Sequence, residues 1–422
     1  MGVRGRKAGW KPALHGCGFA ALWTQAGVVV CLLLIPLFTS CSQREKGFTD
    51  LGPGLAYQNQ QITNVPWSIH VLRLDRAKSD FEFHSVHANG AALGLSPLSE
   101  QIESLRSAPG LPVAGLNGDF YQFAGRPYEG DPRGLQIMDG EVLSAPNGGV
   151  VFWIGLGGEP CVTNVASRFQ VVWPGGVVTP FGLNERRLTN SVVLYTPAIG
   201  RSTRTAGGRE LVLERAGDGA WLPLRMGQTI TARVRKVRDV GNTRLTPDTM
   251  VLSIHPLQTN RPPDVEAGAL LTLSLGSSPS LRGITTAIGG GPILVHHGKI
   301  QKIVIPEDKD PLPYEFASMR ERHPRSALGW NDRYYYLVAV DGRQKKVSVG
   351  MTLDELAGQM RKLGCQEVIN CDGGGSSTLW CNGWVMNNPC DGDERGIANG
   401  LAVVRKSKEE SGTRVAHLRA DH

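Results

Sequence analysis

The chain has 422 residues, a formal net charge of +7, a charged fraction of 20% and 53 glycines. This length allows one large domain or two ordinary ones, and the composition favours a turn-rich protein that contains β-sheet over a helical bundle or a disordered chain. No basic run is interleaved with aromatic residues as a nucleic-acid groove would require, so we expect no nucleic-acid partner.

The N-terminus has the pattern of an export signal. A basic opening precedes an apolar stretch that includes Val28 to Ile35. The next residues, Leu37-Phe38-Thr39-Ser40-Cys41, resemble the lipobox of bacterial lipoproteins, although Phe38 replaces the usual aliphatic residue. An ordinary cleaved signal or an uncleaved anchor are the alternatives, and all three export the chain. We expect residues 1–40 to be a signal sequence, Cys41 to be lipidated and to hold the protein on a membrane of the cell envelope, and residues 41–59 to be a tether.

Strands and one helix are predicted for the first folded stretch. Alternating apolar residues predict strands between Gln60 and Val86, most clearly over Trp67 to Leu74. A helix capped by Ser96 should follow and end near Pro109-Gly110. Its apolar face would consist of Leu98, Ile102 and Leu105.

A polar loop follows the next predicted strand, Leu111 to Leu116. This loop, Asn117-Gly118-Asp119-Phe120-Tyr121, is either a hairpin turn or a site that presents a carboxylate. Asp139-Gly140 then predicts a primed hairpin turn. Between about residues 163 and 281 the strand pattern continues without a fixed repeat, and Thr231 to Val237 alternates with its polar residues outward, which indicates an inserted β-rich region.

Two features precede the C-terminal third. Gly289-Gly290-Gly291-Pro292 joins two predicted strands, and His296-His297 falls at the hairpin turn that follows. Because no third ligand lies nearby at a metal-binding spacing, we interpret the two histidines as a turn and not as a metal site. The polar, proline-containing stretch from Pro306 to Glu321 is predicted to be a surface loop.

A strand–helix–strand unit gives the sharpest local prediction. The strand Tyr334 to Val340 ends at Asp341, and Thr352 with Glu355 forms a capping box for a helix that stops at Gly364. A second strand then leads to Asp372. If the two strands are parallel, both acids lie at one end of a sheet, where open sheets bind ligands. The predicted fold class is α+β, a mixed β-sheet core with a few packed helices and the inserted β-rich region.

The loop Asn370-Cys371-Asp372-Gly373-Gly374-Gly375-Ser376-Ser377-Thr378 is the strongest candidate site. Three consecutive glycines occur where the backbone needs positive φ or approaches another group closely. Their amides form either a donor nest for an oxyanion beside Asp372 or an ordinary tight turn. Five cysteines follow the signal region, and which of them form disulfides stays open. Cys381 could bond Cys390, and Cys365 and Cys371 lie on either side of the strand before the glycine loop. The fifth is Cys161, so at least one of the five must stay unpaired.

Seven segments occur in the order of one known family. They are Asn117 to Tyr121, Gly289 to Pro292, Arg325 to Gly329, Val340 to Arg343, Gly350 to Leu353, Asn370 to Ser377 and Arg395 to Asn399. Together they resemble the phosphodiester glycosidase family, which includes the lysosomal uncovering enzyme and bacterial exported proteins. The resemblance covers roughly residues 117 to 404. Cys371 departs from the apolar residue expected there.

The resemblance implies hydrolysis of a sugar–phosphate bond in a phosphodiester, with release of a sugar such as N-acetylglucosamine. Glycosidases use carboxylates at the anomeric carbon, and arginine forks suit phosphate. The expected catalytic residues are Asp372, Asp341 and Asp119. The expected substrate-binding residues are Asn117, Arg325, Arg343, Gly373, Gly374, Ser376, Ser377 and Arg395.

The expected partner is a glycan or glycolipid that contains a sugar phosphate, such as an exopolysaccharide. No cofactor is certain, a metal site is unknown and a divalent cation stays open. The alternatives are a non-catalytic glycan- or cell-wall-binding lipoprotein and a metal-dependent phosphodiesterase. The domain is expected to span residues 60–404, and the charged tail, residues 405–422, to be disordered.

Overall fold

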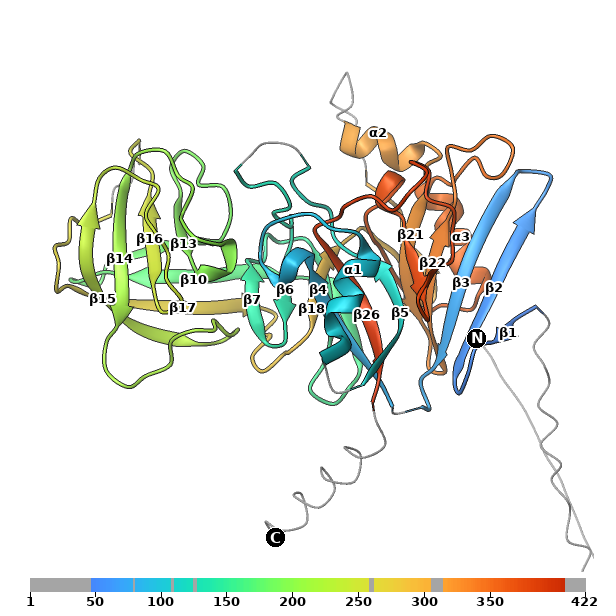
Figure 1. The fold of residues 1–422 in the computed structure, drawn as a ribbon, viewed down its shortest axis with the longest axis horizontal. Helices are drawn as coiled ribbons and strands as arrows, with labels where there is room; N and C mark the ends of the chain where they lie inside the picture. Colours follow the sequence, from blue (N-terminus) through green and yellow to red (C-terminus); the bar gives the residue numbers. More distant parts are fainter. Residues whose placement is uncertain are drawn as a thin grey trace, which may run out of the picture. The chain divides into compact units, whose positions relative to one another are not determined.

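Strands dominate the structure. A computed structural model describes residues 47–78, 80–107, 110–123, 127–257, 262–304 and 314–406. Within these ranges it has 26 strands in four sheets and three α-helices (Figure 1). The predicted α+β class is therefore wrong, and the fold is mostly β. The predicted signal sequence, Cys41 and the tail from residue 407 onward lie outside the described residues.

The first eight-stranded sheet contains the predicted strand–helix–strand unit. Its order is β1(Thr49–Asp50), β2(Leu55–Ile62), β3(Trp67–Asp75), β22(Tyr334–Val340), β21(Arg325–Trp330), β23(Glu367–Asn370), β19(Ile293–His296) and β20(Lys299–Ile300). Both β22 and β23 pair antiparallel with β21, which lies between them, so they run parallel to each other. Asp341 and Asp372 thus follow strands that end at the same side of this sheet. Strand β1 and the first part of β2, up to residue 59, fall within the stretch predicted as a tether.

Strand β22 is buried on both faces, which explains its unbroken apolar sequence. Leu337 and Ala339 pack into one core with a five-stranded sheet, whereas Val338 and Val340 face a second core under helix α3(Leu353–Lys362). The five-stranded sheet consists of β25(Trp384–Val385), β24(Leu379–Cys381), β5(Leu111–Asn117), β26(Asn399–Arg405) and β4(Phe81–His87). The strands that carry Asp119 and Asp372 are therefore held in two sheets that share a core.

A second five-stranded sheet carries the other triple glycine. Its strands are β7(Glu141–Ser144), β6(Gln136–Met138), β18(Ala287–Gly290), β8(Val150–Ile154) and β9(Pro160–Asn164). The turn between β6 and β7 has φ of 49° at Asp139 and 81° at Gly140, which confirms the predicted primed turn. Gly289 and Gly290 belong to β18 itself.

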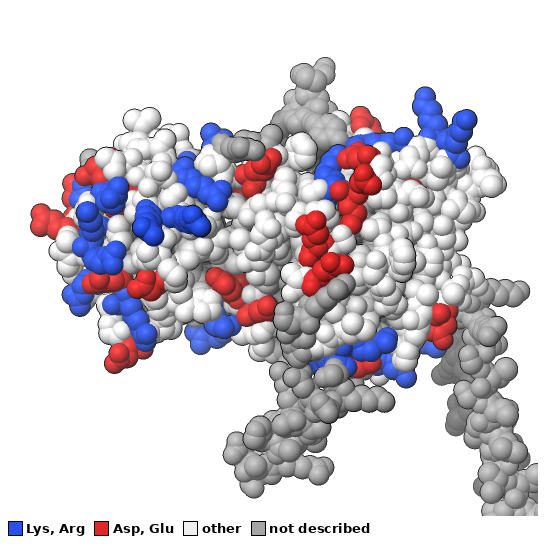
Figure 2. Space-filling view, in the orientation of Figure 1, with Lys and Arg blue, Asp and Glu red and all other residues white. Residues whose placement is uncertain are grey.

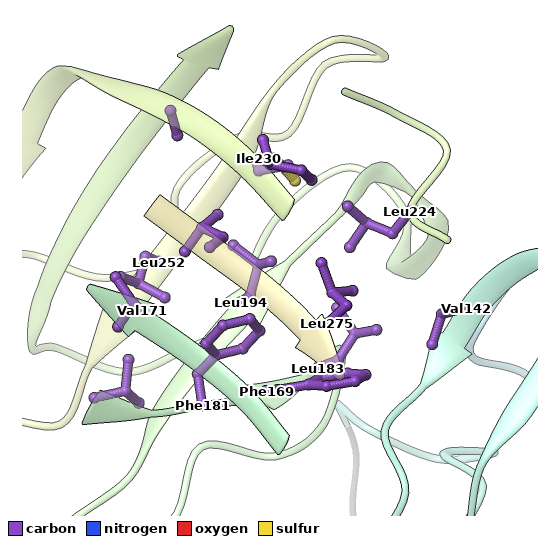
Figure 3. Packing of buried hydrophobic residues seen from close by; sticks show 14 of the residues in the cluster. Val142, Phe169, Val171, Phe181, Leu183, Leu194, Leu224, Ile230, Leu252 and Leu275 are labelled. Atoms are coloured by element: carbon purple, nitrogen blue, oxygen red, sulfur yellow. The ribbon is translucent and has the colours of Figure 1, made fainter. Parts of the chain in front are cut away.

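The remaining eight strands all lie between residues 166 and 278 and form a sheet of their own. They are β11(Val178–Pro180), β10(Ala166–Val172), β17(Leu270–Ser278), β15(Thr229–Arg238), β14(Arg209–Arg215), β16(Met250–Ile254), β13(Val192–Tyr195) and β12(Gly182–Leu183). Buried and exposed residues alternate along β15 up to Arg235, as predicted, and a shift in the pairing with β14 ends the alternation before Val237. Figure 3 shows Phe169, Leu194, Leu252 and Leu275 inside this core. On the face in Figure 2, Lys and Arg side chains lie among Asp and Glu over this sheet.

The helices are fewer and shorter than the α+β class requires. In α3 the side chain of Thr352 accepts from the Glu355 amide and Glu355 accepts from the Thr352 amide, so the capping box is confirmed. Helix α1 covers only Leu98–Glu103 before a 3₁₀ turn, Ser104–Ser107, and Ser96 does not cap it, because Pro97 is its first flanking residue. The stretch predicted as a surface loop contains α2(Tyr314–Arg320).

The described part of the chain has no helix both long and apolar enough to span a membrane. Its five cysteines, Cys161, Cys365, Cys371, Cys381 and Cys390, are free thiols. Burial raises the pKa of Cys365 and of Cys371 to about 12, so these two thiols stay protonated and behave as core residues.

Candidate active site

The two predicted acidic loops interlock. The amide of Asp372 donates to the carbonyl oxygen of Gly118 at 2.9 Å, and Asn117 Nδ2 donates to the carbonyl oxygen of Asp372 at 2.7 Å. The amide of Asp119 is bound by Asn399 Oδ1 at 2.8 Å. Three segments that are distant in sequence therefore bring Asp119 and Asp372 into one site.

Asp119 is a buried carboxyl group, 4% exposed. Its Oδ1 accepts from the Phe120 amide at 2.8 Å and its Oδ2 from the Gly134 amide at 2.7 Å. Burial raises the pKa of Asp119 to about 7, although the hydrogen bonds from these two amides lower it. The negative charge of Asp372 also contributes to the raised pKa. A Cβ added to Gly289 would collide with Oδ2, so the second triple glycine lets the backbone of β18 reach this carboxyl group.

Asp372 differs from Asp119 because part of its surface is open to solvent. Burial raises its pKa to about 6, while hydrogen bonds from Ser376 and from the Gly373 amide, and the charges of Arg395 and Arg133, oppose the rise. The two carboxyl groups thus have different environments, and at neutral pH Asp372 is the more readily ionised. This division is typical of acid–base pairs in active sites.

The glycine loop does not form an open donor nest. Residues Gly374–Ser376 make a 3₁₀ turn, in which the amides of Ser376 and Ser377 donate to the carbonyl oxygens of Gly373 and Gly374. The Gly374 amide donates to the Pro324 carbonyl oxygen at 2.9 Å, and the Ser376 and Ser377 residues are each only 2% exposed. These donors serve the protein itself, so anion binding here depends on side chains.

Two of the predicted arginines supply such side chains. A Cβ added to Gly374, whose φ is +63°, would lie 3.0 Å from Arg343 Nη2, and one added to Gly375 would collide with the guanidinium of Arg395. Arg395 is held by Asp391 Oδ2, which is 2.9 Å from its Nε. Gly374 is required by its positive φ, and Gly373 by the Pro324 carbonyl oxygen, which lies 2.8 Å from the position of an added Cβ. The two guanidinium groups lie against this loop beside Asp372.

Arg325 has a mainly structural environment. It is 6% exposed, and its Nε donates to the carbonyl oxygen of Met351 at 2.8 Å. Its Nη2 donates to the carbonyl oxygens of Ser318 at 2.5 Å and Glu321 at 2.8 Å, at the C-terminal end of α2. Arg325 thus holds this helix end, where a cation is favourable, although its Nη1 also approaches Gly373.

Asn117 and Asp341 also bind protein groups. Asn117 Oδ1 accepts from Ser326 Oγ at 2.6 Å and from the Thr378 amide at 3.0 Å, so this side chain positions the loop around Asp372. Asp341 Oδ2 is 2.9 Å from His70 Nε2, and Asp341 Oδ1 accepts from the Asn388 amide at 2.8 Å. The carboxylate of Asp341 is fully buried and lies in this network, apart from the Asp119–Asp372 pair.

The sequence analysis missed Arg133 and Phe123 as site residues. Arg133 lowers the pKa of both Asp119 and Asp372, yet its surrounding sequence has no recognisable pattern. Phe123 is 58% exposed, lies against Tyr121 and has the Arg395 guanidinium carbon 5.5 Å from its ring centre. The aromatic residues after Asp119 were the available signal, because exposed rings beside a polar site are typical of sugar binding.

Comparison with known proteins supports the family resemblance. Residues 219–404 match the family model described as phosphodiester glycosidase. They belong to this family. The phosphodiester glycosidase match includes Arg343, Asp372 and Arg395, whereas Asp119 precedes it.

The more distant similarities concern the fold. A curated relative, the SPbeta prophage-derived uncharacterized protein YomE of Bacillus subtilis (strain 168), is 34% identical over 89 residues, which are 21% of this chain and 14% of that protein. A hypothetical protein from Synechocystis has a TM-score of 0.67 at 18% identity, over 85% of this chain and 63% of its own. A protein from Burkholderia pseudomallei K96243 has a TM-score of 0.64 at 20% identity, over 81% of this chain and 75% of its own. This chain therefore spans about a seventh of the curated relative and under two thirds of the Synechocystis protein.

Proposed function

We propose that this chain is a hydrolase that cleaves the glycosidic bond of a sugar phosphodiester and releases the sugar from a phosphate monoester. The observation that carries the proposal is the juxtaposition of a carboxyl pair, Asp119 and Asp372, with two guanidinium groups packed against the glycine loop. The match of residues 219–404 to phosphodiester glycosidases supports the same chemistry.

The carboxyl pair would act on the sugar. Asp372 is the accessible member and is ionised more readily, so it would activate water or attack the anomeric carbon. Asp119 is buried and keeps its proton to higher pH, so it would supply or accept a proton at the neighbouring group. The bond from the anomeric carbon to the phosphate oxygen breaks, and the water oxygen ends on the sugar.

The guanidinium groups would act on the phosphate. A phosphate monoester is a good leaving group, so stabilising its charge matters more than protonating it. The guanidinium groups of Arg343 and Arg395 lie against the adjacent Gly374 and Gly375, so both can donate to a phosphate group bound beside the loop. The exposed ring of Phe123 beside Arg395 would contact an apolar face of the sugar.

We also propose that the protein works outside the cytoplasm, anchored through Cys41. The support for this location is the N-terminal sequence, with its apolar stretch and the lipobox-like residues before Cys41. An anchored hydrolase would reach the sugar-phosphate glycans or glycolipids of the cell envelope.

Water labelled with heavy oxygen tests the reaction directly. The purified chain is incubated with an N-acetylglucosamine phosphodiester in labelled water, with and without a chelator. We expect the label in the released sugar and unchanged activity in the chelator. Label in the phosphate would show phosphodiesterase chemistry instead, and binding without turnover would show a glycan-binding protein.

Arg343→Ala tests the phosphate contact. We expect kcat/KM to fall by roughly 10- to 100-fold, because a charge-assisted contact to phosphate contributes about 1.5–3 kcal/mol. Arg343 is exposed, so the melting temperature should stay unchanged. Arg343→Lys is the matched variant: it keeps the charge but loses the fork, and should recover only part of the activity. Full activity of Arg343→Ala would remove this residue from the site.

A further inference from the structure

The turn that carries His296 and His297 lies next to a carboxylate that the sequence does not place there. His296 ends β19, His297 is the first turn residue before β20, and Glu367 begins the neighbouring strand β23. His296 Nδ1 is 2.7 Å from Glu367 Oε2, and His297 Nδ1 is 3.2 Å from Glu367 Oε1. One ligand atom from each residue lies within 4.8 Å of the others.

The backbone explains how consecutive histidines reach the same side. Neighbouring residues in a strand point to opposite faces, but His297 has φ of 47° and begins a left-handed turn with Gly298, whose φ is 71°. The turn rotates the second ring beside the first, and the ring centres are 3.9 Å apart. His297 thus begins the predicted hairpin turn, whereas His296 ends β19, and the turn makes the two rings converge beside Glu367. This convergence departs from the expectation that the two histidines form no metal site, because Glu367 is distant in the sequence.

Glu367 is fixed before any ligand binds. Its Oε1 accepts from the His297 amide at 2.8 Å, and the Gly298 amide donates to the carbonyl oxygen of Gln366 at 2.8 Å. Hydrogen bonds of this kind hold carboxylate ligands in metal sites. The side chains of His296 and His297 are 43% and 79% exposed, so a dissolved ion can reach them.

We propose that His296, His297 and Glu367 form a binding site for a divalent transition-metal ion of the zinc class. Two imidazole nitrogens and one carboxylate are a common ligand set for such ions, and a water molecule would take the fourth position. Ligand atoms in a tetrahedral zinc site lie about 3.4 Å apart, so small side-chain rotations would suffice. The site is at the opposite end of β23 from Asp372, and is therefore a stabilising site apart from the carboxyl pair.

Two properties of the cluster favour a metal ion over a simple ion pair. A single carboxylate faces two imidazoles, each through Nδ1, so three ligand atoms of the kinds that zinc prefers converge on one place. His84 provides the contrast: its two ring nitrogens face different carboxylates, Asp139 and Glu82, and do not converge. His84 is thus a matched control for a histidine that pairs with acids but cannot share an ion with them.

Zinc binding to the chain purified without a histidine tag tests the site. Calorimetry should give one strong site per chain with Kd in the range of about 1–10 μM, and zinc at a hundredfold excess over Kd should raise the melting temperature by about 3–4 °C. His297→Ala and Glu367→Gln should weaken binding at least tenfold, whereas His84→Ala should leave it unchanged. Glu367→Gln keeps an oxygen for the His297 amide, so its fold is retained and a loss of binding reports ligation alone.

Cobalt gives a second readout that does not depend on stability. Bound Co²⁺ should show the visible absorption of a four-coordinate site in the wild type and in His84→Ala, and not in His297→Ala. The inference is overturned if the wild type shows neither a heat of zinc binding nor the cobalt absorption. It is also overturned if His297→Ala and Glu367→Gln bind zinc as tightly as the wild type.

Discussion

Asp372→Asn is expected to lower kcat/KM by at least about 10³-fold, because the accessible carboxylate that we propose acts at the sugar is replaced by a neutral amide. The same substitution should stabilise the fold above pH 6. The carboxyl group ionises with its ordinary pKa of 3.8 in the unfolded chain and about 6 in the folded one. The ionised carboxylate therefore makes the folded state less stable at any pH where the group is ionised in both states.

The pH dependence gives the sign of this effect. Well below pH 4 both states are protonated and the cost is absent; it grows as the pH rises through 4 and is complete above pH 6. Asparagine removes it, so the gain at pH 8 should be about 1–3 kcal/mol, reduced by the solvent that reaches Asp372. Urea unfolding at pH 4 and at pH 8 measures the difference.

Asp332→Asn is the control, because Asp332 is exposed at the other end of β22. It should change neither activity nor the pH dependence of unfolding. Wild-type activity in Asp372→Asn would contradict the assignment of this residue, whereas inactivity with lower stability at every pH would indicate that the carboxylate is structural.

Asp341→Ala is expected to lower the free energy of unfolding by about 1–3 kcal/mol, because it leaves the buried groups that bind this carboxylate without their acceptor. Asp341 binds His70 Nε2, the Asn388 amide and Asn388 Nδ2, and His70 in turn is 2.7 Å from the Tyr57 hydroxyl. Burial alone raises the pKa of Asp341, but the hydrogen bond and charge of His70 bring it below the ordinary value. The group is therefore ionised and bound.

Urea unfolding of Asp341→Ala, with Asp332→Ala as the exposed control in the turn before the same strand, measures this effect. Activity should be assayed at low temperature, where the variant is folded, and should fall far less than in Asp372→Asn. A stability change below about 1 kcal/mol together with complete inactivity would contradict the structural role and return Asp341 to the catalytic group.

Local patterns in the sequence predicted local structure well. The capping box of Thr352 and Glu355, the primed turn at Asp139-Gly140 and the buried strand β22 were predictable because neighbouring residues determine them. The parallel relation of β22 and β23 followed from the helix between them. The α+β class failed because the strands between residues 166 and 278, together with the two five-stranded sheets, outweigh three short helices.

The sequence predicted which residues lie near the candidate site better than it predicted what each of them binds. Asp119, Asp372, Arg343 and Arg395 lie together, but the sequence could not show that Asn117, Arg325 and Asp341 bind other protein groups. Those roles depend on partners that are distant in the chain, such as Ser326 for Asn117 and His70 for Asp341. The contact of Glu367 with His296 and His297 was not predictable for the same reason, because it depends on how β19 and β23 pair.

The interlocked loops also constrain the order in which the protein can mature. Asn117 and Asp372 are 255 positions apart, and Asn399, which binds the Asp119 amide, is 280 positions from it. Contacts between residues this distant in the chain form slowly, so the Asp119–Asp372 pair comes together late in folding. A chain emerging from a ribosome or a translocation channel has no site until β26 has appeared and paired. An assembled site is therefore a sign of complete folding, and truncation within β26, which lies between β5 and β4, should disrupt this sheet together with the site.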